Sequence, residues 1–406
     1  MATVTGSGGS TVTLNAGSND RNGTAAALSA AISTALQNGT LTQTSNTNPP
    51  SGTGLVVLSA GGSTALAAAV TAVLDAGGTP TTVSGSSALG QQILGDNGGL
   101  SYFAAGGSGT IVAGDGNNVF TEPTIGAAGF NVTFGNGNDL IEALSGNNTI
   151  SAGGGVNLIG LGNSNSSVIL GGSLDYVFGN TTGTGGSDTV FGGPGNAILV
   201  PGGSNLYFVG GAGSATVYGG TGTETVFAGA GGGVFAGGSA GKNILVGSLT
   251  GASTLFGGGN GDTLFARGSG VTTLAAGPGN ETLTGAGSTA NNTFFGNAAG
   301  ADLIQGGAGN DTIVAGASST INGGAGANLI VFQAGRSSGT EQINGFNPAQ
   351  GDRATLLGLV AGEISGDVAA AKAVTVNGVA STQITLSNGT NIQFTGVTNL
   401  ATSNFI

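Results

Sequence analysis

The sequence repeats itself every nine residues from about Gly106 to Phe332. Each unit joins a glycine-rich turn to three or four residues of strand type, as in Gly210–Tyr218 (GGAGSATVY) and Gly306–Val314 (GGAGNDTIV). One unit is too short to bury a core by itself, so the units must stack and share one. The repeat therefore predicts a solenoid of parallel strands, with about two units in each turn.

The eighth position of the unit is nearly always a large apolar residue. Neighbouring residues of a strand point to opposite faces, so one constant apolar position marks the face that turns inward. We expect the core to contain Ile141, Ile150, Ile159, Val168, Val177, Val190, Leu199, Phe208, Val217, Val226, Phe235, Leu264, Leu283, Ile313 and Ile330.

Glycine supplies 87 of the 406 residues, yet 38% of the chain is hydrophobic, so glycine here serves tight turns rather than disordered linkers. Only 6% of the residues are charged, and the net charge is −12. Nucleic acids and anionic membranes attract basic proteins, so neither is an expected partner. The longest apolar run, around Ala65–Leu74, is too short to span a membrane, and we expect no membrane insertion.

Catalytic side chains are scarce. The chain has no Cys and no His, which removes the commonest general base, the thiol nucleophile and the usual zinc ligands. Lys242 and Arg267 are the only basic residues between Gly106 and Phe332. An enzyme that cleaves polysaccharide needs a base and charge-stabilising partners in a cleft, so we expect no enzyme.

The region before the repeats, residues 1–105, has a different pattern and predicts a small α/β N-terminal domain. Alanine-rich stretches with apolar residues three and four apart predict two helices, Thr24–Gln37 and Ser63–Asp75. Strands are expected at Thr11–Leu14 and Leu55–Leu58, and a loop at Ser45–Gly54.

The region after the repeats predicts a β-rich C-terminal domain over residues 339–406, so that residues 106–338 form the solenoid. Alternating strand patterns occur at Ala373–Val376, Gln383–Leu386 and Asn391–Phe394. Asn388-Gly389 is a hairpin turn signal between the last two. The predicted fold class is therefore mainly β, a parallel β-solenoid with a small domain at each end.

The unit resembles the G-G-x-G-x-D-x-U-x repeat of the RTX (haemolysin-type calcium-binding) family. The resemblance implies a parallel β-roll in which calcium lies between stacked loops, held by sixth-position Asp carboxylates and turn carbonyls. Calcium requires six to eight oxygen ligands, which such loops can supply together. The residues here that match the ligand position in three rows are Asp139, Asn157 and Asp175; Asp262, Glu281 and Asp302; and Asp311 and Asn328.

The match to the calcium pattern is partial. Between the rows, the sixth position changes to Ala197, Leu206, Ala215, Glu224 and Gly233, so we expect no calcium there. The resemblance implies calcium as a cofactor, bound at few sites. The alternative is that Asn, Gly and backbone groups close the turns without metal.

The stretch Asn344–Leu356 (NGFNPAQGDRATL) and the residues that follow resemble the C-terminal region of RTX-type substrates of type I secretion. This resemblance implies an extracellular or cell-surface protein of a Gram-negative bacterium, exported by a C-terminal signal. An ordinary β-rich cap on the solenoid would fit the same residues.

The ninth position is often large and apolar and should lie on the outer face. Rows of outward Phe and Val indicate either an interface or the shielding of strand edges. Together with low charge, they predict a self-assembling extracellular structural protein, a surface-layer, filament or biofilm-matrix subunit, whose main partner is itself. The alternative is a secreted adhesin or a ligand- or ice-binding solenoid, for which a cell-surface glycan is a possible partner. The outward ninth-position residues are Phe178, Phe191, Val200, Val209, Tyr218, Phe227, Phe256 and Phe265.

Overall fold

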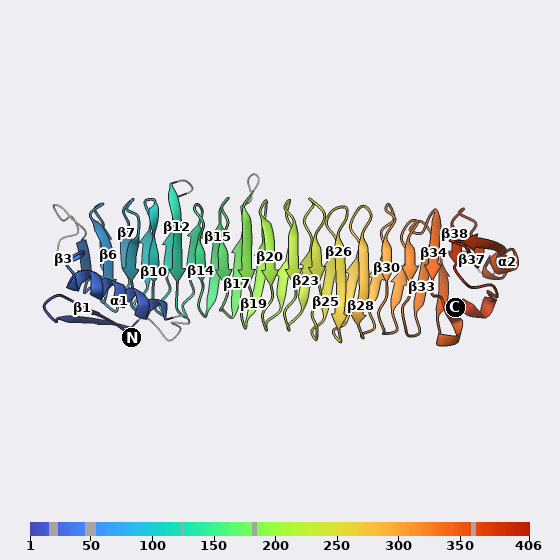
Figure 1. Cartoon of the computed structure of the whole chain (residues 1–406), viewed down its shortest axis with the longest axis horizontal. Helices are drawn as coiled ribbons and strands as arrows, with labels where there is room; N and C mark the ends of the chain where they lie inside the picture. Colours follow the sequence, from blue (N-terminus) through green and yellow to red (C-terminus); the bar gives the residue numbers. More distant parts are fainter. Residues whose placement is uncertain (16–22, 45–53, 124–125, 181–184, 359–362) are drawn as a thin grey trace. The chain divides into compact units, whose positions relative to one another are not determined.

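The computed structural model describes residues 1–15, 23–44, 54–123, 126–180, 185–358 and 363–406. The chain divides into two compact units, Met1–Tyr207 and Phe208–Ile406, and the division falls within β20 (Asn205–Val209). Each unit contains a parallel β-solenoid, which confirms the predicted fold class. Figure 1 shows the strands of each unit standing side by side. The loop expected at Ser45–Gly54 lies, up to Thr53, outside the described residues.

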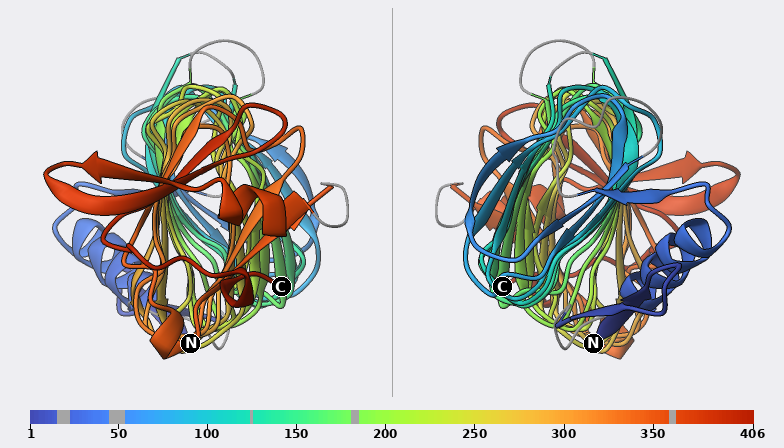
Figure 2. Two further views of the ribbon diagram at one scale, coloured as in Figure 1. Left: turned by 90° about the vertical axis from the view of Figure 1, so that its right-hand side faces the viewer. Right: turned by 90° about the vertical axis from the view of Figure 1, so that its left-hand side faces the viewer.

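Within each unit the chain alternates between two sheets. From β4 to β35, strands with odd numbers pair in one sheet, the odd-strand sheet, and strands with even numbers pair in the other, the even-strand sheet, which β3 also joins. In the first unit Ile141 pairs with Ile159, so one coil contains two units of nine residues, as predicted. Seen end-on, the coils of a unit overlie one another (Figure 2).

The odd-strand sheet of the first unit contains β5 (Gly62–Ala65), β7 (Thr81–Ser84), β9 (Leu100–Phe103), β11 (Val119–Thr121), β13 (Leu140–Ala143), β15 (Val156–Leu161), β17 (Leu174–Phe178) and β19 (Asn196–Val200). Its even-strand sheet contains β3 (Thr42–Thr44), β4 (Gly54–Leu58), β6 (Val70–Asp75), β8 (Gln91–Leu94), β10 (Gly107–Val112), β12 (Ala127–Thr133), β14 (Thr149–Ser151), β16 (Ser167–Ile169) and β18 (Ser187–Phe191).

The odd-strand sheet of the second unit contains β21 (Ala215–Val217), β23 (Gly233–Ala236), β25 (Ser253–Phe256), β27 (Thr272–Ala275), β29 (Thr293–Phe295), β31 (Thr312–Val314), β33 (Leu329–Gln333) and β35 (Arg353–Leu357). Its even-strand sheet contains β22 (Glu224–Phe227), β24 (Ile244–Val246), β26 (Thr263–Gly268), β28 (Thr282–Ser288), β30 (Leu303–Gln305), β32 (Thr320–Asn322) and β34 (Thr340–Asn344).

The core lies between the two sheets of each unit. Every eighth-position side chain expected in the core is buried, which confirms the register deduced from the repeat. Ninth-position side chains point outward as expected: Phe178, Phe191, Tyr218, Phe256 and Phe265 are exposed, and Val200, Val209 and Phe227 are half-buried.

The stacked turns leave no room for side chains at several glycines. A Cβ atom on Gly153 would collide with the backbone carbonyl oxygen of Gly135, one coil earlier. The glycine content therefore reflects close contact between the turns of neighbouring coils, as well as tight turning within each one.

The N-terminal segment packs on the outside of the first solenoid. The helix α1 (Thr24–Gln37) has the bounds expected from the sequence, and β1 (Ala2–Thr5) and β2 (Thr11–Leu14) form an antiparallel hairpin beside it. Leu28, Ile32 and Leu36 of the helix pack against outward residues of the even-strand sheet, including Leu74 and Leu94. Figure 2 shows the helix lying along one side of the coils of this unit.

The helix expected at Ser63–Asp75 is wrong, because these residues form β5 and β6. In β6, Val73 faces the core while Ala72 and Leu74 lie in the cluster formed with α1. A strand that is buried on both faces has apolar residues at nearly every position. In such a run, some apolar residues are also three and four apart, which is the spacing expected of a helix.

Parallel strands extend beyond both boundaries deduced from the sequence. The pairs β5–β7, β7–β9 and β6–β8 already lie within residues 54–105, and β34 and β35 lie beyond residue 338. Residue 106 is therefore where the nonapeptide pattern becomes recognisable in the sequence, whereas the solenoid itself begins earlier.

The C-terminal segment ends the second unit with antiparallel strands. β36 (Lys372–Val376), β37 (Val379–Thr385) and β38 (Asn391–Phe394) occupy the three expected positions, and the Asn388-Gly389 turn joins the last two. β38 also pairs in parallel with β34. The short helices η1 (Pro348–Gln350), α2 (Glu363–Ala369) and η2 (Thr402–Asn404) complete the segment. Across the described ranges, no helix has the length and hydrophobicity to cross a membrane.

Candidate metal centre

Sixth-position side chains form polar columns along the inner edges of the sheets. The sixth residue lies two positions before the buried eighth residue and therefore also points inward, but at the start of its strand, beside the turn. All eight residues expected to bind calcium are buried at this position. Parallel pairing places each one beside the sixth residue of the next coil, so the three expected rows exist.

In the first unit, the column along the odd-strand sheet contains Asn118, Asp139, Asn157 and Asp175. The backbone N–H and side-chain amide of Asn118 donate to Asp139 Oδ1 at 2.8 and 3.0 Å. The N–H of Asp139 donates to Asn157 Oδ1 at 3.1 Å, and Asn157 Nδ2 donates to Asp175 Oδ1 at 2.7 Å. The column is a hydrogen-bonded ladder in which amides and carboxylates alternate.

In the second unit, the column along the even-strand sheet brings together Asp262, Glu281 and Asp302, which directly precede β26, β28 and β30. Asp262 accepts four hydrogen bonds: Asn243 donates its N–H and its amide to Oδ1, and Gly258 and Gly259 donate to Oδ2. The N–H of Glu281 donates to Asp302 Oδ1 at 3.0 Å.

The third expected row, Asp311 and Asn328, lies along the odd-strand sheet of the second unit. Asp311 Oδ1 accepts from the N–H of Asn292 at 2.7 Å and Oδ2 from that of Gly307 at 2.8 Å. The N–H of Asp311 donates to Asn328 Oδ1, and that of Asn328 to Asp352 Oδ1. Both carboxylate oxygens of Asp311 are therefore engaged by backbone donors.

Asparagine amides lie where several oxygens converge. Asn297 Nδ2 donates to Gly279 O at 2.6 Å, Glu281 Oε2 at 3.0 Å and Asp302 Oδ1 at 3.3 Å. Asn118 Nδ2 likewise donates to the carbonyls of Gly114 and Gly116 and to Asp139 Oδ1. Turn carbonyls together with a carboxylate are the oxygen ligands that calcium prefers. Each of these side-chain amides therefore occupies a position in which a cation could lie instead.

Two of the expected ligands keep a carboxylate oxygen without a donor. Asp139 Oδ2 and Glu281 Oε1 are buried and accept no hydrogen bond from the described residues. Burial raises the pKa of Asp139 to about 7, against the opposing effect of the hydrogen bonds from Asn118. Burial, followed by the adjacent Asp302 carboxyl, raises the pKa of Glu281 to about 8. Either a proton or a bound cation relieves such oxygens, because an unpaired buried carboxylate is costly.

The fit to calcium therefore differs along the columns. Asp139 and the Glu281–Asp302 pair have the donor chemistry and the unsatisfied oxygen that a cation needs, whereas Asp262 and Asp311 are saturated by N–H donors. Within the described residues, no three acidic side chains cluster closely enough to form a metal cage, so backbone carbonyls would have to supply most ligands. The residues fit a small number of sites rather than a continuous row.

Several members of the columns were not among the ligands expected from the sequence. Asn118, Asn243, Asn292, Asp352, Asp188 and Glu341 are also buried and bonded to the neighbouring coil. Asp188 is the sixth residue of its unit and was detectable. Glu341 and Asp352 lie in coils where the nine-residue spacing has been lost, so their equivalence becomes visible only in the strand pairing.

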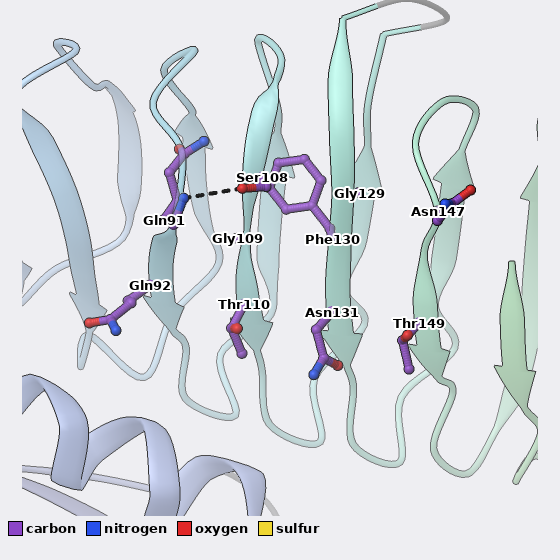
Figure 3. Close-up of a pocket in the computed structure, with 11 residues that line it drawn as sticks. Gln91, Gln92, Ser108, Gly109, Thr110, Gly129, Phe130, Asn131, Asn147 and Thr149 are labelled. Carbon is purple, nitrogen blue, oxygen red and sulfur yellow. Dashed lines mark hydrogen bonds between the residues drawn. The ribbon is translucent and has the colours of Figure 1, made fainter. Parts of the chain in front are cut away.

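A polar groove lies on the outside of the even-strand sheet of the first unit. Figure 3 shows Gln92, Thr110, Asn131 and Thr149 at equivalent places on successive strands, and Ser108 Oγ accepts a hydrogen bond from the N–H of Gly90 at 3.2 Å. The residues that line it carry amides and hydroxyls but no ionisable group. The groove could bind through hydrogen bonds, and it holds no acid or base for catalysis.

The fold and these turns define a class of protein, a parallel β-solenoid built from nonapeptide coils. The repeat itself is of a known type: residues 135–168, 182–199, 207–235, 286–319 and 298–330 match the model of the RTX calcium-binding nonapeptide repeat (4 copies). The chain thus carries RTX repeats, as the resemblance indicated. No curated protein matches the chain.

The repeat type has consequences for function. RTX nonapeptides are calcium-binding motifs and imply a secreted or extracellular protein. The RTX solenoid is a structural fold typical of non-enzymatic proteins, although some RTX proteins are toxins or enzymes.

Proposed function

We propose that the protein is an extracellular structural subunit that self-assembles, as in a surface layer, a filament or a biofilm matrix. The observation that carries the proposal is an apolar face on the odd-strand sheet of the first unit. Its outward side chains on β13, β15, β17 and β19 are mostly apolar, with Glu142 and Asn196 at its edges as the polar exceptions; the apolar ones are Leu140, Val156, Leu158, Leu174, Tyr176, Phe178, Ile198 and Val200.

Strand pairing makes this face continuous. Leu140 is level with Leu158, Leu158 with Tyr176, and Tyr176 with Ile198, which produces an apolar row across four strands. Leu158 is 45% exposed and Phe178 is 39% exposed. Contiguous apolar surface of this kind on a soluble chain marks an interaction site.

The charge distribution also favours association. Among the residues that the structure describes, 13 acidic side chains are buried and cannot repel another copy at the surface. They are Asp75, Asp96, Glu122, Asp139, Asp175, Asp188, Glu224, Asp262, Glu281, Asp302, Asp311, Glu341 and Asp352. The outer surface is therefore much closer to neutral than the net charge of −12 indicates.

The size of the apolar face sets the expected strength of one contact. Four strands about 4.8 Å apart and five residues long present roughly 300 Å² per copy. A contact between two copies would bury about 600 Å², below the roughly 1,000 Å² of a stable interface. Assembly therefore needs several contacts per chain and should depend steeply on concentration.

Calcium enters this proposal as a stabiliser at few sites, with Asp139, Glu281 and Asp302 as the residues that would hold it. The unpartnered oxygens of Asp139 and Glu281 support this assignment. Export by a type I system of a Gram-negative bacterium is also proposed, on the resemblance of the C-terminal stretch to such substrates.

The test compares two double substitutions of the same kind. Replacing Leu158 and Phe178 by Asp should abolish concentration-dependent assembly, measured by light scattering with calcium present. The control pair, Thr149→Asp and Ser167→Asp, lies on the outer side of the even-strand sheet and should leave assembly intact. A wild-type chain that stays monomeric at high concentration with calcium would refute the proposal.

A further inference from the structure

The odd-strand sheet of the second unit has a different outer face, in which aromatic and small residues alternate. The ninth-position column contains Tyr218, Ala236, Phe256, Ala275 and Phe295, on five successive coils. Strand pairing sets Ala236 level with Phe256, Phe256 level with Ala275, and Ala275 level with Phe295. Tyr218 directly follows β21, which pairs with β23 in the same register. An aromatic ring therefore occurs on every second coil.

These rings are accessible. Tyr218 is 57% exposed and Phe256 is 43% exposed, and an alanine separates each ring from the next. Phe295 is half-buried, and the Arg336 guanidinium lies 5.9 Å from its ring centroid. The column thus presents separate aromatic platforms instead of one apolar ridge.

A column of hydroxyl groups runs beside the rings. Thr254, Thr273, Thr293 and Thr312 occupy the seventh position on four successive strands and are paired in register. All four are half-buried on the outer side of the sheet. Thr216 occupies the same column on β21, and Val234 stands between it and Thr254.

Apart from Arg336, whose guanidinium lies over the Phe295 ring, the strands of this face carry no charge. Among the described residues of β21, β23, β25, β27 and β29, every outward side chain is apolar, aromatic or a threonine. An anionic or cationic ligand would find no partner on these strands. A ligand with apolar faces and hydroxyl edges would match both columns.

We propose that this face binds a neutral, extended β-1,4-linked polysaccharide of the cellulose or chitin type. Coils of a parallel sheet are about 4.8 Å apart, so rings on every second coil are roughly 9.6 Å apart. This spacing is close to the disaccharide repeat of such a chain, in which alternate sugars present the same ring face. Sugars would stack on the exposed rings of Tyr218 and Phe256, while their hydroxyls bond to the threonine column.

The alternation argues for a glycan over a second copy of the protein. The apolar face of the first unit is continuous, as sheet-to-sheet packing requires, whereas here an alanine gap follows each ring and hydroxyls line one side. A flat row of platforms needs no cleft, and it becomes visible only when every second coil is compared.

The experiment measures depletion of the full-length protein by microcrystalline cellulose and, separately, by chitin. We expect binding to at least one polymer and about tenfold weaker partition for Phe256→Ala and for Tyr218→Ala. Phe265→Ala is the matched control, because Phe265 is similarly exposed but lies on the even-strand sheet. Thr273→Val keeps the shape of the side chain and should weaken binding without changing the thermal melting curve.

Comparing cellulose with chitin shows which sugar the face binds. The other outcomes decide whether the proposal stands. Absence of wild-type binding to both polymers overturns it, as does an equal loss in the Phe265→Ala control. Light scattering is run in parallel. If Phe256→Ala changes only the oligomeric state, the face belongs to a contact between copies and the proposal fails. The self-assembly proposal is tested by Leu158 and Phe178, so the two can fail separately.

Discussion

Buried carboxylates satisfied by N–H groups of the next coil are the characteristic residue-level feature of this solenoid. Each carboxylate takes up donors that the tight turns leave unpaired, so it closes a turn and ties two coils together. The cost is desolvation of a charge, which appears as raised pKa values.

The cost of desolvating a buried carboxylate can be measured at Glu122, which is not one of the candidate calcium ligands. Its Oε1 accepts from the N–H of Ser145 and the amide of Asn148, and its Oε2 has no donor among the described residues. Burial raises the pKa of Glu122 to about 7, against the opposing effect of these hydrogen bonds. Because the folded pKa lies above the unfolded value, stability should fall as pH rises from about 4.5 to 7 and stay low above pH 7.

In wild type, the free energy of unfolding should fall between pH 4 and pH 8. We expect this fall to be smaller by on the order of 2 kcal/mol in Glu122→Gln, measured by denaturant unfolding in the presence of a chelator. Glu142→Gln, on the outward side of β13, is the control and should retain the wild-type slope. An unchanged slope in Glu122→Gln would show that Glu122 is not the titrating group.

The asparagine amides suggest a second experiment at this scale. Asn243 Nδ2 donates to Gly238 O at 2.7 Å and to Asp262 Oδ1 at 2.9 Å. Asn243→Asp would set a carboxylate against both oxygens, which should destabilise the chain by about 3 kcal/mol without metal.

Calcium should restore much of that loss, so the melting temperature of Asn243→Asp should respond more strongly to calcium than that of the wild type. Asn291→Asp, at an exposed turn position, is the control and should show the wild-type response. An Asn243→Asp variant indifferent to calcium would mean that the amide does not occupy a cation-like position.

At the scale of elements, the repeat coils were predictable and the flanking coils were not. The eighth-position rule works because one inward residue per short strand is a local property of the sequence. Outside the repeats, at Val70–Asp75, the spacing of apolar residues predicted a helix instead, because α1 buries the outer face of the strand and removes the alternation of apolar and polar residues. The sixth-position rows were also predictable. Which hydrogen bonds each carboxylate oxygen accepts was not predictable, because the donors belong to the neighbouring coil and a local sequence pattern does not identify them.

Close stacking of turns predicts a strong effect at Gly153. A methyl group there would meet the carbonyl oxygen of Gly135, so the two turns would have to separate. We expect Gly153→Ala to cost roughly 1–3 kcal/mol by thermal or chemical unfolding. Gly8→Ala, where a Cβ meets nothing within 4 Å, should have little effect, and equal effects at both sites would contradict the stacking explanation.

At the scale of the whole molecule, a solenoid must protect the last strand of each sheet. In the second unit, the outer edge of β35 is covered by the end of the chain: Ala354 pairs with Phe405, and the N–H of Ile406 donates to Ala354 O at 2.9 Å. Phe405 is held by its edge-on contact with Phe394 at 6.1 Å. An uncovered parallel edge invites strand addition from another chain.

Phe405→Asp should release this segment and expose β35. We expect faster hydrogen exchange at β35 and increased association in light scattering. Ile406→Asp changes a side chain that is already exposed and should do neither. Unchanged exchange in Phe405→Asp would mean that the edge is protected by other residues.

The regular pairing of coils also bears on how such a gene can change. Asp139, Asn157 and Asp175 follow one another at intervals of 18 residues and occupy equivalent positions on successive coils. A duplication or deletion of one such interval returns the chain to the same strand register, and an interval of two coils also preserves the alternation of amide and carboxylate. Length can therefore vary by unequal recombination between similar coding segments without an intermediate that fails to fold. Any surface built column by column, such as the row of aromatic platforms, would lengthen with it.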